Sequence, residues 1–258
     1  TLSDLAEVLY QRGEYAAAAE HQAEALAIAR QTGYMWVELA VQGDLGCSQM
    51  RLGEWGAART NLQVAVAGYR RLGERLDVVR YELRLAEMER HLGNASRAHG
   101  LAADALALAR RRESPWHETE SLAALALAEL ATGNRDAALA HAGEAVEAGQ
   151  RDGRPGVLVA AWLARGEVAL ALGDNAGAVE AAGRVLELEE VIGQWDRAAA
   201  AALRSVALAS RSDLEAAWAG ADKAGNRPAG WCVALALAAW HRQAGDERAA
   251  QRWQRTAE

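Results

Sequence analysis

A turn residue recurs every twenty residues along most of this chain, and it is nearly always glycine. One series has a spacing of forty residues: Gly13, Gly53, Gly93, Gly133 and Gly173. A second series lies midway at the same spacing: Gly33, Gly73, Glu113, Gly153 and Gly193. Each block between two turns has the length of one helix, and a fixed period in this range is typical of stacked helical repeats. The sequence therefore predicts an all-α solenoid of about seven antiparallel helix pairs, in which the glycines of the second series end helices as left-handed caps.

Small residues occupy fixed places within the repeat. Alanine stands five residues after each glycine of the first series, and alanine or glycine stands seven residues before it. The residues are Ala18, Ala58, Ala98, Ala138 and Ala178 after the turn, and Ala6, Gly46, Ala86, Ala126 and Gly166 before it. Because small side chains let two helices approach closely, we expect these positions to form the contacts within and between pairs.

The second repeat carries the fullest motif, with Leu45-Gly46, Gly53-Glu54-Trp55, Ala58 and Ala65. This pattern resembles the tetratricopeptide repeat (TPR) family, and the resemblance extends over essentially the whole chain. It implies a right-handed superhelix whose concave surface is lined mainly by the first helix of each pair. The usual period of that family is about thirty-four residues, so each helix here is longer. Long, alanine-rich arrays of this kind resemble the C-terminal sensor arms of bacterial LuxR-type and STAND ATPase regulators.

The regular spacing covers residues 1–200 and then changes. A Gly/Asn/Pro loop is expected from Gly225 to Gly230, and a last turn at Gly245. Variant terminal repeats commonly cap a solenoid, so we interpret residues 201–258 as capping repeats of one domain that spans 1–258. Since Thr1 falls inside the first predicted helix, we expect the chain to be a fragment of a larger protein.

Composition argues against several classes of function. The net charge of −7 disfavours direct nucleic-acid binding, which needs a concentrated positive surface. No apolar run is long enough to span a bilayer and no signal peptide is visible, so we expect no membrane partner. Cys47 and Cys232 lie many repeats apart, and two isolated cysteines fit a cytoplasmic location.

Catalytic and metal-binding motifs are missing from the sequence. It contains no phosphate-binding glycine loop, and its six histidines show no HxxxH or HExxH spacing. The acidic stretch of Glu187, Glu189 and Glu190 is interpreted as the solvated end of a helix. We therefore predict no enzyme activity, no catalytic residue, no metal and no cofactor.

The third pair offers the most polar inner face. Arg80, Arg84, Glu87 and Arg90 follow one another at three- or four-residue steps, which places them on one side of a helix. Arginine is well suited to binding carboxylates or phosphates, so this row is the candidate polar end of a ligand or peptide groove whose later part is apolar. Alternatively, the arginines pair within the helix with Glu82, Glu87 and Glu89.

Trp36, Trp116 and Trp195 each open a first helix. They are interpreted either as core residues between pairs or as exposed binding anchors.

These observations predict a non-enzymatic scaffold that binds a protein or peptide, as the sensor or regulatory arm of a bacterial signalling or transcriptional regulator. Two alternatives stay open. The groove could sense a small-molecule effector, or the array could regulate an attached enzyme such as a caspase-like protease or a cyclase.

Overall fold

The computed structural model describes residues 1–73, 76–188 and 192–257, and these residues form fourteen α-helices and no strand. The all-α prediction is confirmed. The helices are α1 (Leu2–Gln11), α2 (Tyr15–Thr32), α3 (Met35–Leu52), α4 (Trp55–Arg71), α5 (Leu76–His91), α6 (Ala95–Arg111), α7 (Pro115–Thr132), α8 (Arg135–Asp152), α9 (Pro155–Ala171), α10 (Asn175–Leu186), α11 (Gln194–Leu208), α12 (Arg211–Lys223), α13 (Arg227–Gln243) and α14 (Glu247–Thr256).

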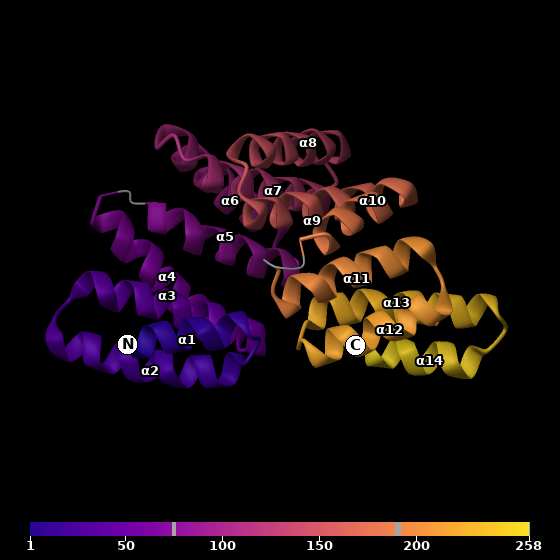
Figure 1. Cartoon of the computed structure of the whole chain (residues 1–258), viewed down its shortest axis with the longest axis horizontal. Helices are drawn as coiled ribbons and strands as arrows, with labels where there is room; N and C mark the ends of the chain where they lie inside the picture. The colour runs from indigo at the N-terminus through magenta and orange to yellow at the C-terminus, as the bar shows by residue number, and fades with distance from the viewer. Residues whose placement is uncertain (74–75, 189–191, 258) are drawn as a thin grey trace.

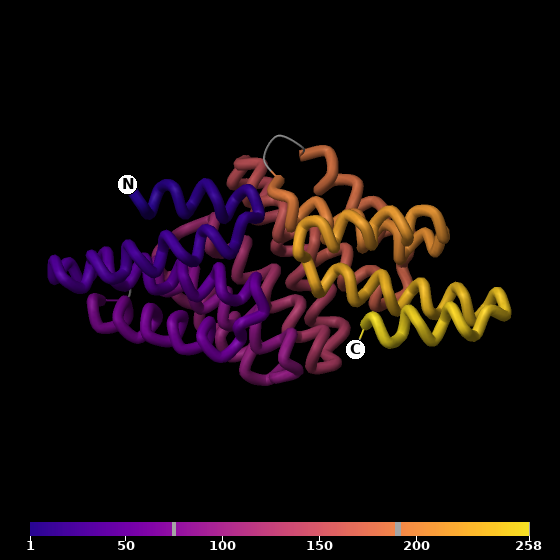
Figure 2. Tube along the Cα trace, turned by 90° about the horizontal axis from the view of Figure 1, so that it is seen from below, coloured from indigo at the N-terminus to yellow at the C-terminus, as the bar shows by residue number. Residues whose placement is uncertain are grey.

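Consecutive helices pack against each other, and the first helices of successive pairs also touch. Thus α5 contacts α7, α7 contacts α9, α9 contacts α11, and α11 contacts α13. The pairs follow one another around an arch, with α1–α4 at one foot, α6–α10 across the top and α11–α14 at the other foot (Figure 1). The view from below shows the first and last pairs on opposite sides of the molecule (Figure 2). The chain is therefore a TPR-like helical solenoid.

The turns follow the predicted glycines with one exception. All five glycines of the first series adopt φ between 78° and 87°, a left-handed conformation that suits glycine. In the second series, Glu113 adopts a similar conformation with φ of 51°. Gly193 contradicts the prediction, since its φ of −72° and ψ of 169° are extended and it precedes α11 instead of ending α10. α10 ends earlier, at Leu186, and Gly193 instead takes the N-cap position of α11.

The predicted small residues form the closest contacts of the solenoid. The five alanines after the first-series turns are all 0 % exposed. At Gly46 an added methyl group would lie 2.8 Å from Cγ of Leu62, and at Gly166 it would lie 2.3 Å from Cδ2 of Leu203. A larger side chain at these positions would push neighbouring helices apart, which explains why the repeat keeps them small.

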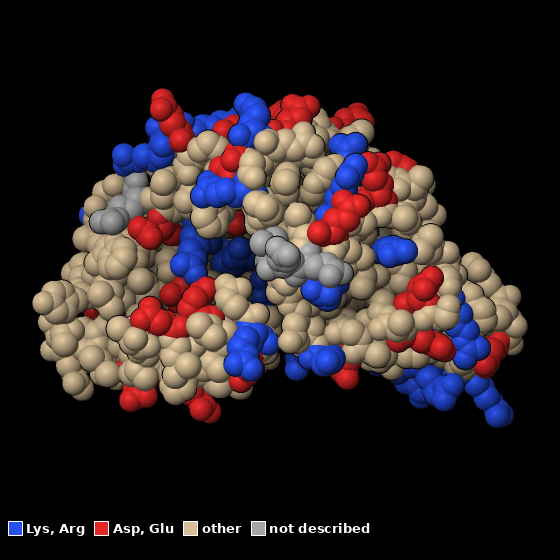
Figure 3. Space-filling model, viewed as in Figure 1, with Lys and Arg blue, Asp and Glu red and all other residues tan. Residues whose placement is uncertain are grey.

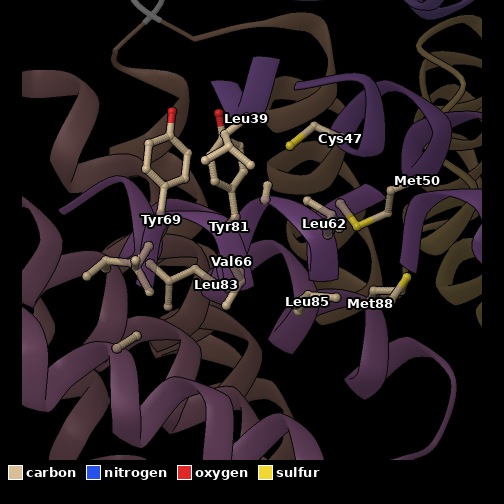
Figure 4. Packing of buried hydrophobic residues seen from close by; sticks show 14 of the residues in the cluster. Leu39, Cys47, Met50, Leu62, Val66, Tyr69, Tyr81, Leu83, Leu85 and Met88 are labelled. Carbon is tan, nitrogen blue, oxygen red and sulfur yellow. The ribbon is translucent and has the colours of Figure 1, made fainter. Parts of the chain in front are cut away.

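The largest buried cluster fills the space between α3, α4 and α5 (Figure 4). Its aromatic part is the stacked pair Tyr69 and Tyr81, whose ring centroids are 5.9 Å apart. The single hydroxyl hydrogen of Tyr81 is shared between the carbonyl oxygen of Ala40 at 3.0 Å and Oδ1 of Asp44 at 3.1 Å. The ring therefore holds the second and third pairs together at a fixed orientation.

In the C-terminal part of the chain, one predicted boundary was wrong. α13 begins at Arg227, inside the loop expected from Gly225 to Gly230. Asn226 caps this helix by accepting a hydrogen bond from the Ala229 amide at 3.1 Å, and Pro228 is tolerated in the first turn. The turn at Gly245 is confirmed by its φ of 80°.

Three further expectations concern the acidic stretch, membrane-spanning helices and the division of the chain into repeats. Glu187 is exposed as expected, whereas Glu189 and Glu190 lie outside the described residues. Among the described helices, none is long and apolar enough to cross a membrane. The division of one domain into regular and capping repeats stays a prediction.

Candidate binding cavity

The concave side of the solenoid contains a cavity of about 490 Å³. Its described lining comes from the first helices α3, α5, α7, α9, α11 and α13 and from the residue that caps α13. Figure 3 shows the molecule hollowed between its two feet, with Lys and Arg atoms in the depth of the hollow. The stacking of first helices on the inner side thus creates the cavity, as the TPR resemblance implied.

Most of the cavity wall is apolar. Its large side chains include Leu127, Leu163, Leu170, Val206, Trp231 and Leu235. Between them stand alanines such as Ala124, Ala160 and Ala199, which leave space because their side chains are short. The wall could therefore accept an extended apolar segment, with gaps for its side chains.

A buried ion cluster forms the polar end. Arg51 donates from Nη1 to Oε1 of Glu87 at 2.7 Å, and Arg84 donates from Nη1 to Oε2 of the same carboxylate at 2.8 Å. Arg51 also donates from Nε to the hydroxyl of Tyr10 at 3.2 Å, and its side chain is only 9 % exposed. Its guanidinium lies 4.0 Å from the ring centroid of Trp195. One carboxylate thus bridges two arginines, and the three groups together keep one net positive charge.

The other polar residues of the cavity wall lie outside this ion cluster. Arg90 lies 3.6 Å from a carboxylate oxygen of Glu167, across the cavity on α9. Burial, together with the charge of Arg90, lowers the pKa of the neighbouring His91 to about 4, so this imidazole is neutral near pH 7. Glu120 of α7 and Asp196 of α11 also line the cavity.

The charge of Glu87 should make stability depend on pH. Burial alone would raise the pKa of Glu87, but the charges of Arg51 and Arg84 outweigh burial and hold it far below its usual value. A carboxylate whose pKa is lower in the folded than in the unfolded state stabilises the fold above its unfolded pKa, about 4.3, and loses that contribution on acidification. We therefore expect the free energy of unfolding, measured in urea, to decrease when the pH is lowered below about 4. In Glu87→Gln this part of the pH dependence should disappear, and an unchanged profile would contradict the assignment.

Only three of the four predicted site residues lie in the cavity wall. Arg84, Glu87 and Arg90 line the cavity, but Arg80 does not. Arg80 lies 3.1 Å from Oδ1 of Asp44 and 5.5 Å from the ring centroid of Tyr81.

The alternative prediction, that the arginines form ion pairs with glutamates of their own helix, is correct only for Arg84 and Glu87. The other two carboxylates are bound from neighbouring helices: Glu82 pairs with Arg70, and Glu89 pairs with Arg59 at 3.0 Å. The arginines of α5 therefore mostly connect helices to one another.

Several cavity residues were missed by sequence reasoning. Arg51 was overlooked because its position beside a turn suggests a solvated helix end, and Asp196 because nothing in the sequence relates α11 to α5. The tryptophans divide between the two interpretations. Trp36 and Trp116 are 46 % and 44 % exposed, whereas Trp195 is half-buried at the cavity and packs edge-on against Tyr15 with ring centroids 6.0 Å apart.

No cluster of three or more His, Cys, Asp or Glu side chains that could hold a metal ion occurs in the described parts of the chain.

The fold of the described residues resembles those of several solved structures. A Rap protein complexed with competence and sporulation factor superimposes with a TM-score of 0.84 at 12 % identity, covering 99 % of this chain and 72 % of that one. The Rap conjugation regulator of plasmid pLS20, complexed with a Phr peptide, gives 0.79 at 14 % identity, with 98 % and 70 % covered. A STAND protein with a tetratricopeptide repeat sensor from Pyrococcus horikoshii gives 0.58 at 18 % identity, with 99 % and 41 % covered.

Sequence comparison gives a narrower result. No curated protein matches the sequence. Residues 1–32 match the tetratricopeptide repeat family model, and the fold of the described residues is that of TPR-like solenoids. The first 32 residues thus match the tetratricopeptide repeat family, and the described chain as a whole has a TPR-like helical-repeat fold.

Proposed function

We propose that this chain is a non-enzymatic module that binds a peptide in its concave cavity, as the sensor arm of a bacterial cytoplasmic signalling or transcriptional regulator. The observation that carries the proposal is the cavity of about 490 Å³ lined by six first helices. A pocket of this size with an apolar wall and a few polar groups is typical of a binding site. The peptide complexed with the Rap conjugation regulator of plasmid pLS20, a protein of similar fold, supports the choice of ligand.

The proposal assigns a role to each part of the cavity wall. Arg84, Glu87 and Arg90 form the polar end of the site, together with Arg51, and the apolar side chains of α7, α9, α11 and α13 hold the body of the peptide. Burial of those side chains against the peptide would provide most of the binding free energy, at roughly 25 cal/mol per Å² of apolar surface. The polar end would fix the direction of the peptide.

A variant that fills the cavity tests the proposal. Ala160 is half-buried and lines the cavity wall, so Ala160→Phe should occupy the space of the peptide. We expect peptides selected from a displayed random library to bind the unmodified chain in calorimetric titration and to lose at least tenfold in affinity for this variant. Ala57→Phe is the matched control, because Ala57 is exposed on α4, outside the cavity. Failure of any peptide to bind, or equal affinity for both variants, would refute the proposal.

A further inference from the structure

The charges that line the cavity are not balanced. Each of the three arginines has an acidic partner: Arg51 and Arg84 share Glu87, and Arg90 faces Glu167. Glu120 and Asp196 line the same cavity, yet the side chain of neither forms a hydrogen bond or an ion pair with any residue that the structure describes. With His91 neutral, four carboxylates stand against three guanidinium groups.

The two unpaired carboxylates belong to the same end of the cavity. Asp196 interacts electrostatically with Arg51 and Arg84, and Glu120 interacts with Arg84, although neither carboxylate lies close enough to form an ion pair. Burial also raises the pKa of Asp196, because the carboxylate has lost part of its contact with water. A partly buried carboxylate without a partner is costly, and a cation beside it would offset that cost.

We propose that this end of the cavity binds the cationic side chain of a lysine or arginine, held between Glu120 and Asp196, within an otherwise apolar peptide. The inference rests on the proposed function and reverses the expectation from sequence that the arginines of α5 hold an anionic group. An anionic group would be repelled by Glu120 and Asp196, and it would have to displace Glu87 from both of its arginines. A cationic group would be repelled by Arg51 and Arg84, but it meets two carboxylates whose side chains form no hydrogen bond or ion pair with any described residue.

A displayed library of random seven-residue peptides tests this selectivity. The library is selected in parallel on the unmodified chain and on the double variant Glu120→Gln/Asp196→Asn. We expect lysine and arginine to be enriched over aspartate and glutamate in the first selection, and the enrichment to disappear in the second. For one selected peptide, calorimetric titration should show that the double variant weakens binding at least tenfold, as expected for the loss of a charge-assisted hydrogen bond.

Three controls separate the possible outcomes. The same peptide with its basic residue replaced by glutamine should bind both proteins with similar, weaker affinity. Asp222→Asn changes an exposed carboxylate of α12 outside the cavity and should leave affinity unchanged. Thermal unfolding should show that the double variant is fully folded at the temperature of the titration, so that a loss of affinity cannot be ascribed to a loss of structure.

Selected peptides rich in acidic residues, or unchanged affinity in the double variant, would overturn the cationic site and leave the proposed peptide function standing. A library from which no peptide is enriched would overturn both.

Discussion

Replacement of Gly43 by alanine is expected to destabilise the chain by about 3 kcal/mol, the upper part of the usual range for overpacking a core. The added methyl group would lie 2.3 Å from Cε1 and 2.4 Å from Cζ of Tyr81. The ring cannot move away easily, because it is 1 % exposed and its hydroxyl is bound to Ala40 and Asp44. Urea unfolding followed by circular dichroism measures the effect.

Gly100→Ala provides the matched control. Gly100 lies inside α6, and a methyl group there would meet no atom within 4 Å. Since alanine is favoured over glycine in a helix by about 0.5–1 kcal/mol, this variant should be slightly more stable than the unmodified chain. If the two variants had the same effect, the close approach between α3 and α5 would not be the cause.

Arg51→Ala should have an effect of similar or larger size, about 3–5 kcal/mol, as is usual when one member of a buried ion pair is removed. The substitution leaves Glu87 with Arg84 alone and removes the contacts of α3 with Tyr10 and Trp195. The same unfolding experiment measures it. Arg204→Ala, at an exposed position of α11 without an ion-pair partner among the described residues, should change stability by less than about 0.5 kcal/mol. Equal losses in the two variants would mean that Arg51 contributes no more than a surface charge.

The sequence predicted the parts of the fold that depend on neighbouring residues. A left-handed turn needs glycine at one position, and a close helix contact needs alanine or glycine at another, so Gly13, Ala18 and their equivalents could be placed from spacing alone. Gly193 was misinterpreted because its place in the series says nothing about where α10 stops. The loop expected after Gly225 was wrong for a similar reason, since the cap supplied by Asn226 outweighs the turn tendency of the glycines and proline around it.

The cavity could be predicted only in outline. Helical spacing placed Arg80, Arg84 and Arg90 on one face of α5, but it could not show that Asp44 of α3 binds Arg80 outside the cavity. The contact of Arg51 with Trp195 joins α3 to α11, and its existence depends on the curvature of the whole array. That curvature is the sum of small rotations from one pair to the next, which no local motif records.

The contact between Trp195 and the early helices changes how the array should lose its structure. In a repeat protein whose units touch only their sequence neighbours, stability is nearly a sum over adjacent units, and the ends can fray independently. Here Tyr15 and Arg51 pack against Trp195, so the first two pairs are also neighbours of the sixth. Melting of either foot of the arch exposes part of the other. We therefore expect the two ends of the array to unfold together, because loss of structure at one end removes contacts that stabilise the other.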